Sequence, residues 1–80
     1  MDFIMMAVRK VSLRPVEAKE LVDIASACDF DIDISYNRYT VDAKSILGVL
    51  ALDFSQVLTI SYNGTDERLE AFLASHALAC

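Results

Sequence analysis

The chain has 80 residues, of which 55% are hydrophobic, and its formal net charge at pH 7 is −5. This length predicts one domain over residues 1–80, and the acidic excess disfavours nucleic acid as a main partner. Two cysteines, Cys28 and Cys80, are too few for a disulfide framework and lack the spacing of a zinc site, and no apolar run is long enough to span a membrane. We therefore expect a cytoplasmic protein with no metal and no cofactor.

The N-terminal part of the chain predicts a strand followed by a helix. Residues 2–8 form a nearly continuous apolar run of strand length, which the basic pair at 9–10 is expected to end. Residues 15–28 carry apolar side chains at helical spacing, with Ser12 at the place of an N-cap and Pro15 in the first turn. The apolar stripe of this helix comprises Ala18, Leu21, Val22, Ala25 and Cys28.

The next segment predicts a β-hairpin. Residues 29–36 alternate strictly between apolar and polar side chains, which indicates a strand with one buried and one exposed face. Asn37-Arg38 forms a two-residue turn before a second short strand at 39–42. Arg38 is less favourable in such a turn than glycine would be.

The C-terminal half predicts a short helix, a strand and a final helix. A helix is expected at 44–52, where Gly48 costs about 1 kcal/mol relative to alanine and so suggests a close approach of another group. Residues 57–62 alternate as a strand does, and residues 65–79 have helical spacing. The final helix has Asp66 and Glu67 in its first turn and Leu69, Phe72, Leu73 and Ala77 along its apolar face.

The predicted elements follow the order β-α-β-β-α-β-α. This order fits the α+β class, in which an antiparallel sheet carries helices on one face. We therefore expect an open-faced β-sandwich with a four-stranded antiparallel sheet and three helices on one side of it.

The motifs of two segments resemble those of a known family. The segment at 44–52 looks like the regulatory helix of the HPr phosphocarrier family, which opens with Lys-Ser-Ile and continues with a Gly-Val step. Arg14-Pro15 agrees with the family's His-x-Arg-Pro signature, the element order is the same, and the resemblance spans nearly the whole chain. Two features depart from the family. Ser12 stands at the place of the active histidine, and the loop at 53–56 is shorter and lacks the usual glycines.

The resemblance implies the scaffold but argues against the family's carrier chemistry. In the phosphotransferase system, HPr receives a phosphoryl group from Enzyme I on an imidazole nitrogen and passes it on. A serine hydroxyl is a weak nucleophile without a neighbouring base, and a phosphoserine ester is too stable to serve as a donor. The chain is similar in this respect to the regulator Crh, which also lacks the active histidine.

Ser12 and its neighbours allow more than one interpretation. Ser12 could be a plain helix N-cap, or Ser12 and Arg14 could join the free N–H groups of the helix start to bind an anion such as phosphate or a partner's carboxylate. His76 is the only histidine in the chain. In the HPr family the chain terminus comes near the active centre, so His76 is a conceivable substitute acceptor.

The 44–52 segment supplies the other candidate site residues. In HPr proteins of some bacteria, and in Crh, a kinase phosphorylates the serine that corresponds to Ser45, and the product binds a transcriptional regulator. Ser45 is either such a site or an ordinary first-turn serine. The apolar residues Ile46, Leu47 and Leu50 either pack into the core or form a docking face for partner proteins, as the resemblance implies.

Three functional classes remain open. The first is a regulatory or protein-interaction domain that is not a competent histidine phosphocarrier, with other proteins as its partners. The second is a phosphocarrier with an unusual acceptor, and the third is a diverged HPr relative of unknown role. An enzyme is the least favoured class, because no nucleophile–base pair, carboxylate pair or metal cluster stands at a recognisable spacing. The sequence favours the first class.

Overall fold

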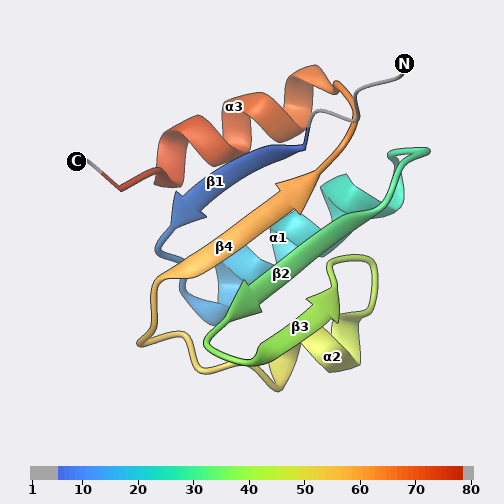
Figure 1. The fold of residues 1–80 in the computed structure, drawn as a ribbon. Helices are drawn as coiled ribbons and strands as arrows, with labels where there is room; N and C mark the ends of the chain where they lie inside the picture. Colours follow the sequence, from blue (N-terminus) through green and yellow to red (C-terminus); the bar gives the residue numbers. More distant parts are fainter. Residues whose placement is uncertain (1–5, 79–80) are drawn as a thin grey trace, which may run out of the picture.

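A computed structural model describes residues 6–78 of the chain as a four-stranded sheet with three helices. The strands are β1 (Ala7–Val11), β2 (Ile32–Tyr36), β3 (Tyr39–Asp42) and β4 (Leu58–Tyr62), and the helices are α1 (Pro15–Ser26), α2 (Ile46–Leu50) and α3 (Glu67–His76). The strands pair antiparallel in the order β1-β4-β2-β3. In Figure 1, α1 lies behind β2 and β4, α2 lies by β3, and α3 runs along β1. The predicted α+β class, element order and open-faced sandwich are confirmed.

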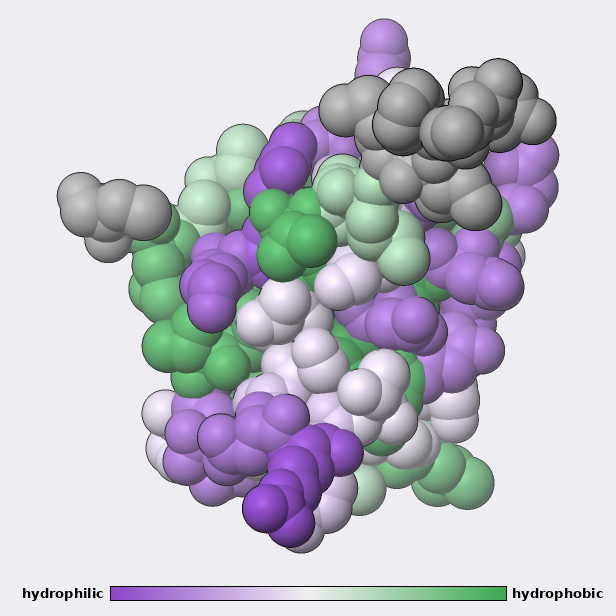
Figure 2. All heavy atoms as spheres, viewed as in Figure 1, coloured by the Kyte–Doolittle hydropathy of each residue, from purple (hydrophilic) through white to green (hydrophobic). Residues whose placement is uncertain are grey.

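The core forms between one face of the sheet and the helices. Alternate residues of β2 and β4 point into it, and Ile34 and Ile60 face each other across the two strands with no exposed surface. The other face of the sheet is open, and Figure 2 shows the weakly polar side chains at its centre. The apolar stripe predicted for the first helix is buried as expected, and α3 contributes Leu69, Phe72 and Leu73. Burial of these side chains is the main source of stability.

The first strand differs from the prediction. Most of the predicted strand at 2–8 lies outside the described residues, and β1 continues through Arg9 and Lys10, which were expected to end it. These two residues are tolerated because β1 is an edge strand whose middle residues are exposed. The Arg9 guanidinium also lies 3.6 Å from the Glu70 carboxylate on α3. The strand is fixed to the core by Val11, which is fully buried.

Strand β3 has the predicted bounds, and the other elements after β1 are shorter than predicted. Helix α1 ends at Ser26 rather than at 28, α2 covers 46–50 rather than 44–52, and α3 covers 67–76 rather than 65–79. Strands β2 and β4 begin at 32 and 58, later than expected. Ala77 was predicted on the apolar face of the last helix but is exposed, because its backbone is extended and forms a bridge with Val11.

The hairpin between β2 and β3 has the predicted two-residue loop. Tyr36 pairs with Tyr39, and Asn37 has a φ of 52°, in the left-handed region that asparagine tolerates. Arg38 does not have a positive φ, so the turn avoids the conformation in which arginine would be strained.

In the part of the chain that the structure describes, no helix is long and apolar enough to cross a membrane.

Candidate functional site

The first candidate site lies where β1 ends and α1 begins. The prediction of Ser12 as the N-cap is wrong, because α1 begins at Pro15 and Arg14 is its N-cap. Two residues separate Ser12 from the helix, and the first of them, Leu13, is buried in the core and only 3% exposed. Ser12 is exposed, and its backbone N–H donates a hydrogen bond to the carbonyl oxygen of His76 at 3.3 Å. The end of α3 is thereby fixed beside Ser12.

Glu17 helps to cap the start of α1, a role that the sequence analysis did not predict. Its Oε1 accepts a hydrogen bond from the Arg14 backbone N–H at 2.8 Å, and its Oε2 accepts one from the Arg14 guanidinium at 3.0 Å. These hydrogen bonds lower the pKa of Glu17 and raise that of Arg14. A signal was present, since a glutamate three residues after an N-cap is typical of a capping box.

His76 joins the same cluster from the other side. Its Nδ1 lies 3.8 Å from Oε2 of Glu17, and its ring centroid lies 4.6 Å from that of Phe72. The start of α1 and the end of α3 are therefore linked by a cluster of one guanidinium, one carboxylate and one imidazole. The anion-binding pair of Ser12 and Arg14 stays a prediction, and one nitrogen of the Arg14 guanidinium is already hydrogen-bonded to the carboxylate of Glu17.

The second candidate site is the start of α2. Ser45 is the N-cap of α2, and its Oγ accepts a hydrogen bond from the Gly48 N–H at 3.3 Å. Ser45 is exposed, so a modifying enzyme could reach it. A Cβ at position 48 would lie 3.3 Å from the Ser45 Oγ and 3.5 Å from Cβ of Val41, which explains the close approach that the glycine suggested. The Lys44 ammonium donates a hydrogen bond to the Cys28 carbonyl at 3.0 Å and ties α2 to the end of α1.

The apolar residues of α2 divide between the core and the surface. Val49 is fully buried, whereas Ile46, Leu47 and Leu50 are 37%, 81% and 45% exposed. A hollow of about 320 Å³ lies beside α2, lined by Tyr36, Tyr39, Val41, Gly48, Ala51 and Leu52. We name the three exposed side chains, Ile46, Leu47 and Leu50, the α2 apolar face.

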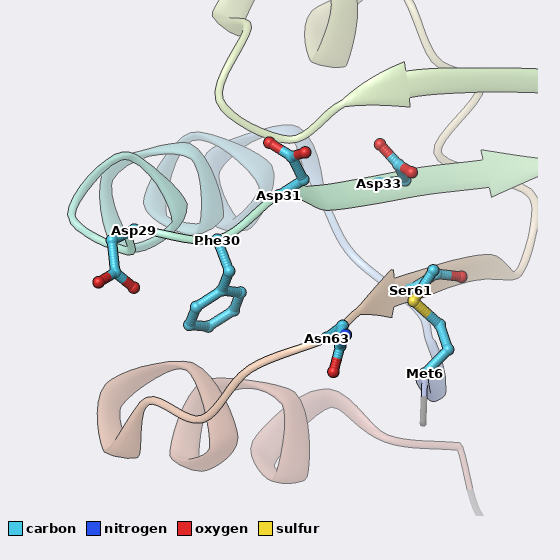
Figure 3. Close-up of a pocket in the computed structure, with 7 residues that line it drawn as sticks. All are labelled: Met6, Asp29, Phe30, Asp31, Asp33, Ser61 and Asn63. Carbon is cyan, nitrogen blue, oxygen red and sulfur yellow. The ribbon is translucent and has the colours of Figure 1, made fainter. Parts of the chain in front are cut away.

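A further hollow opens on the uncovered side of the sheet (Figure 3). Its volume is about 470 Å³, and it is lined by Met6, Asp29, Phe30, Asp31, Asp33, Ser61 and Asn63. Figure 3 shows the Asp29 carboxylate apart from those of Asp31 and Asp33. Among residues 6–78, no group of three or more histidine, cysteine, aspartate or glutamate side chains is arranged to hold a metal ion.

The two cysteines contribute no reactive site that the structure describes. Cys28 is buried, and its thiol donates a hydrogen bond to the Ile24 carbonyl at 3.4 Å. Burial, followed by the nearby Asp66 carboxylate, raises the pKa of the Cys28 thiol, so it stays protonated and packs as an apolar group. Cys80 lies outside the described residues.

A family profile and a solved structure match this chain. The profile of the family described as the PTS HPr component phosphorylation site matches residues 8–77. The crystal structure of a phosphocarrier protein HPr from Bacillus anthracis str. Ames is similar to this chain, with a TM-score of 0.67 and 34% sequence identity over 89% of this chain and 96% of that one.

Proposed function

The chain belongs to the HPr family of the phosphotransferase system, and from that premise we propose that it is a regulatory or protein-interaction domain that does not act as a histidine phosphocarrier. The observation that carries the proposal is the residue at the β1–α1 junction. Ser12 precedes Arg14 and Pro15 there, at the place where the family has its histidine, and the chain's single histidine is His76 on α3.

The chemistry of serine supports this proposal. Carrier activity needs a group that accepts a phosphoryl group near neutral pH and holds it in a labile P–N bond. The Ser12 hydroxyl can form only a phosphate ester, which is too stable to serve as a donor. Incubation with phosphoenolpyruvate and Enzyme I should therefore leave the chain without an acid-labile phosphoryl group, and a label of phosphohistidine character would refute the proposal.

The anion-binding role of Ser12 and Arg14 belongs to the same proposal. The exposed hydroxyl of Ser12 and the guanidinium of Arg14, which is 75% exposed, are available to an anionic group of a partner protein. Glu17 competes for that guanidinium, so we expect weak binding. An NMR titration with inorganic phosphate tests this, and unchanged amide shifts at residues 12–17 up to millimolar phosphate would rule out the anion site.

The α2 apolar face is the proposed docking surface. Leu47 is the most exposed of its members, and exposed apolar groups that cluster in this way are typical of a protein interface. The proposed partners are proteins of the phosphotransferase system or transcriptional regulators, met in the cytoplasm. Leu47→Glu and Leu50→Glu should weaken binding to Enzyme I or to a transcriptional regulator. The variant Val16→Glu on α1 measures separately how much α1 contributes to that binding. Unchanged binding by folded Leu47→Glu and Leu50→Glu variants would remove the claim.

Regulation at Ser45 is the second part of the proposal. The exposed position of Ser45 and its role as the α2 N-cap support it, because an added phosphate of about −2 charge is favoured before the first turn of a helix. Incubation with an HPr kinase and ATP should label the chain, and Ser45→Ala should abolish the label. Equal labelling of the Ser45→Ala variant would place the modification elsewhere.

A phosphocarrier with an unusual acceptor is the second candidate function. It is favoured by the hydrogen bond from Ser12 N–H to the His76 carbonyl, because this contact sets the only histidine beside the place of the family's acceptor. Nδ1 of His76 faces Glu17, so Nε2 would be the accepting nitrogen. If this function is correct, phosphoenolpyruvate and Enzyme I label the chain and His76→Gln abolishes the label.

A further inference from the structure

We propose that Glu17 is a second determinant, separate from Ser12, that keeps this chain from carrying a phosphoryl group. The inference rests on the proposed function, since it assumes that position 12 is the place of the family's acceptor. It concerns a positioning effect: Glu17 occupies the groups that a phosphoryl group at position 12 would need.

Glu17 uses both carboxylate oxygens on one residue. Oε1 accepts a hydrogen bond from the Arg14 backbone N–H, and Oε2 accepts one from the guanidinium. Nδ1 of His76 lies 3.8 Å from Oε2. The Glu17 side chain is 18% exposed against 75% for Arg14, so the carboxylate lies on the protein side of the ion pair. The carboxylate therefore has contacts with both the start of α1 and the end of α3, and it binds one nitrogen of the guanidinium.

The charge of Glu17 opposes a phosphoryl group in the same place. A phosphoryl group on an imidazole carries negative charge and is stabilised by a guanidinium and by free N–H groups at a helix start. The Glu17 carboxylate has the same sign and already binds these donors, so a phosphoryl group would have to displace it or share Arg14 with it. Restoring a histidine at position 12 should not be sufficient to restore transfer.

The transfer step itself needs only reactants that can be named. In the Ser12→His variant, a neutral imidazole nitrogen at position 12 attacks phosphorus in the phosphohistidine of Enzyme I, which phosphoenolpyruvate has phosphorylated. A P–N bond forms on the acceptor as the donor's P–N bond breaks, and the donor ring leaves as neutral imidazole. The proton on the acceptor's other ring nitrogen stays there, so the acceptor ring then carries the charge that the donor ring has lost. Glu17 takes no part in these bonds, and its effect is on how well the product is held.

The experiment compares three variants, with the unsubstituted chain run beside them: Ser12→His, Ser12→His with Glu17→Gln, and Ser12→His with Glu20→Gln. Glu20 is exposed on α1 and makes no ion pair among the described contacts, so its substitution removes the same charge without freeing Arg14. Each variant is incubated with phosphoenolpyruvate and Enzyme I, and the initial rate of acid-labile labelling is measured. We expect labelling at least about tenfold faster for the Glu17→Gln double variant than for the other two.

The outcomes separate this inference from the proposed function. Equal rates for Ser12→His and for the Glu17→Gln double variant overturn the inference, and so does a failure of both to be labelled while NMR spectra show them folded. A Glu20→Gln double variant as fast as the Glu17→Gln one overturns it too, because net charge would then explain the gain. Peptide mass spectrometry locates the label. A label on His76 of the unsubstituted chain counts against the proposed function and leaves the comparison at position 12 intact.

Discussion

The Glu17 carboxylate accepts hydrogen bonds from both the backbone N–H and the guanidinium of Arg14, at 2.8 and 3.0 Å. The hydrogen bond from the guanidinium is the main cause of the lowered pKa of Glu17, so the folded chain binds a proton there less readily than the unfolded chain does. The resulting stabilisation is fully present above the ordinary value of 4.5 and is lost as the pH falls through the lowered pKa.

The acid sensitivity of this contact is the first prediction. The melting temperature of the natural chain should fall more steeply below pH 4.5 than that of Glu17→Gln, whose amide does not titrate. Thermal unfolding followed by circular dichroism between pH 3 and 7 measures the difference, with Glu20→Gln as the matched control. Parallel curves for the natural chain and Glu17→Gln would show that the contact adds nothing to stability.

The second prediction is that ionisation of the Tyr62 phenol lowers the stability of the protein at alkaline pH. The hydroxyl donates a hydrogen bond to Glu70, and burial, together with that carboxylate, raises the pKa of Tyr62 to about 12. The unfolded phenol titrates near 10, so stability should be complete below pH 10 and decline between 10 and 12. Denaturant unfolding of Tyr62→Phe should show a smaller decline over this range. At neutral pH this variant should lose about 1 kcal/mol with its hydrogen bond.

Truncation of two leucines should differ strongly in its cost to stability. Leu47 is 81% exposed, so Leu47→Ala should change the free energy of unfolding by no more than about 0.5 kcal/mol. Leu69 has no exposed surface, and Leu69→Ala should cost about 2–5 kcal/mol through lost burial and a cavity. Urea unfolding measures both. A large loss for Leu47→Ala would mean that α2 packs more deeply and that its apolar face is not free for a partner.

Gly64 should not tolerate a side chain. A Cβ at this position would overlap Cγ and Cδ1 of the Phe30 ring, near its attachment to the backbone, where the ring cannot swing away cheaply. Gly64→Ala should therefore destabilise the protein by about 1–3 kcal/mol, and Phe30→Ala in the same chain should remove that penalty. A double-variant cycle with urea unfolding checks this, and additive effects of the two substitutions would contradict the overlap.

The sequence predicted the fold well because its elements carry strong local signals. The alternation at 29–36 and the stripe that includes Leu21 each match one periodicity, and the buried faces of β2 and α1 follow them. The ends of elements were harder to predict, because tertiary contacts decide them. Ala77 leaves its helix to pair with Val11, and β1 continues past Arg9 because an edge strand tolerates exposed charge.

The candidate site was predicted in part. The expected helix start pointed to Ser12 and Arg14, and the resemblance to the HPr family pointed to Ser45; their roles stay predictions. The sequence did not show that Glu17 turns back onto Arg14, because the capping-box spacing becomes recognisable only when Arg14, rather than Ser12, is the N-cap. The contact between Ser12 and His76 spans 64 positions of the chain and depends on the whole sheet, so no local pattern could reveal it.

The central claim, that this member of the HPr family does not carry a phosphoryl group on histidine, is tested most directly by intact-mass spectrometry of the natural chain after incubation with phosphoenolpyruvate and Enzyme I. A histidine-bearing HPr in the same tube confirms that transfer is active. We predict that the HPr gains one phosphoryl group while the mass of this chain stays unchanged. An equal gain on this chain that mild acid removes would contradict the claim.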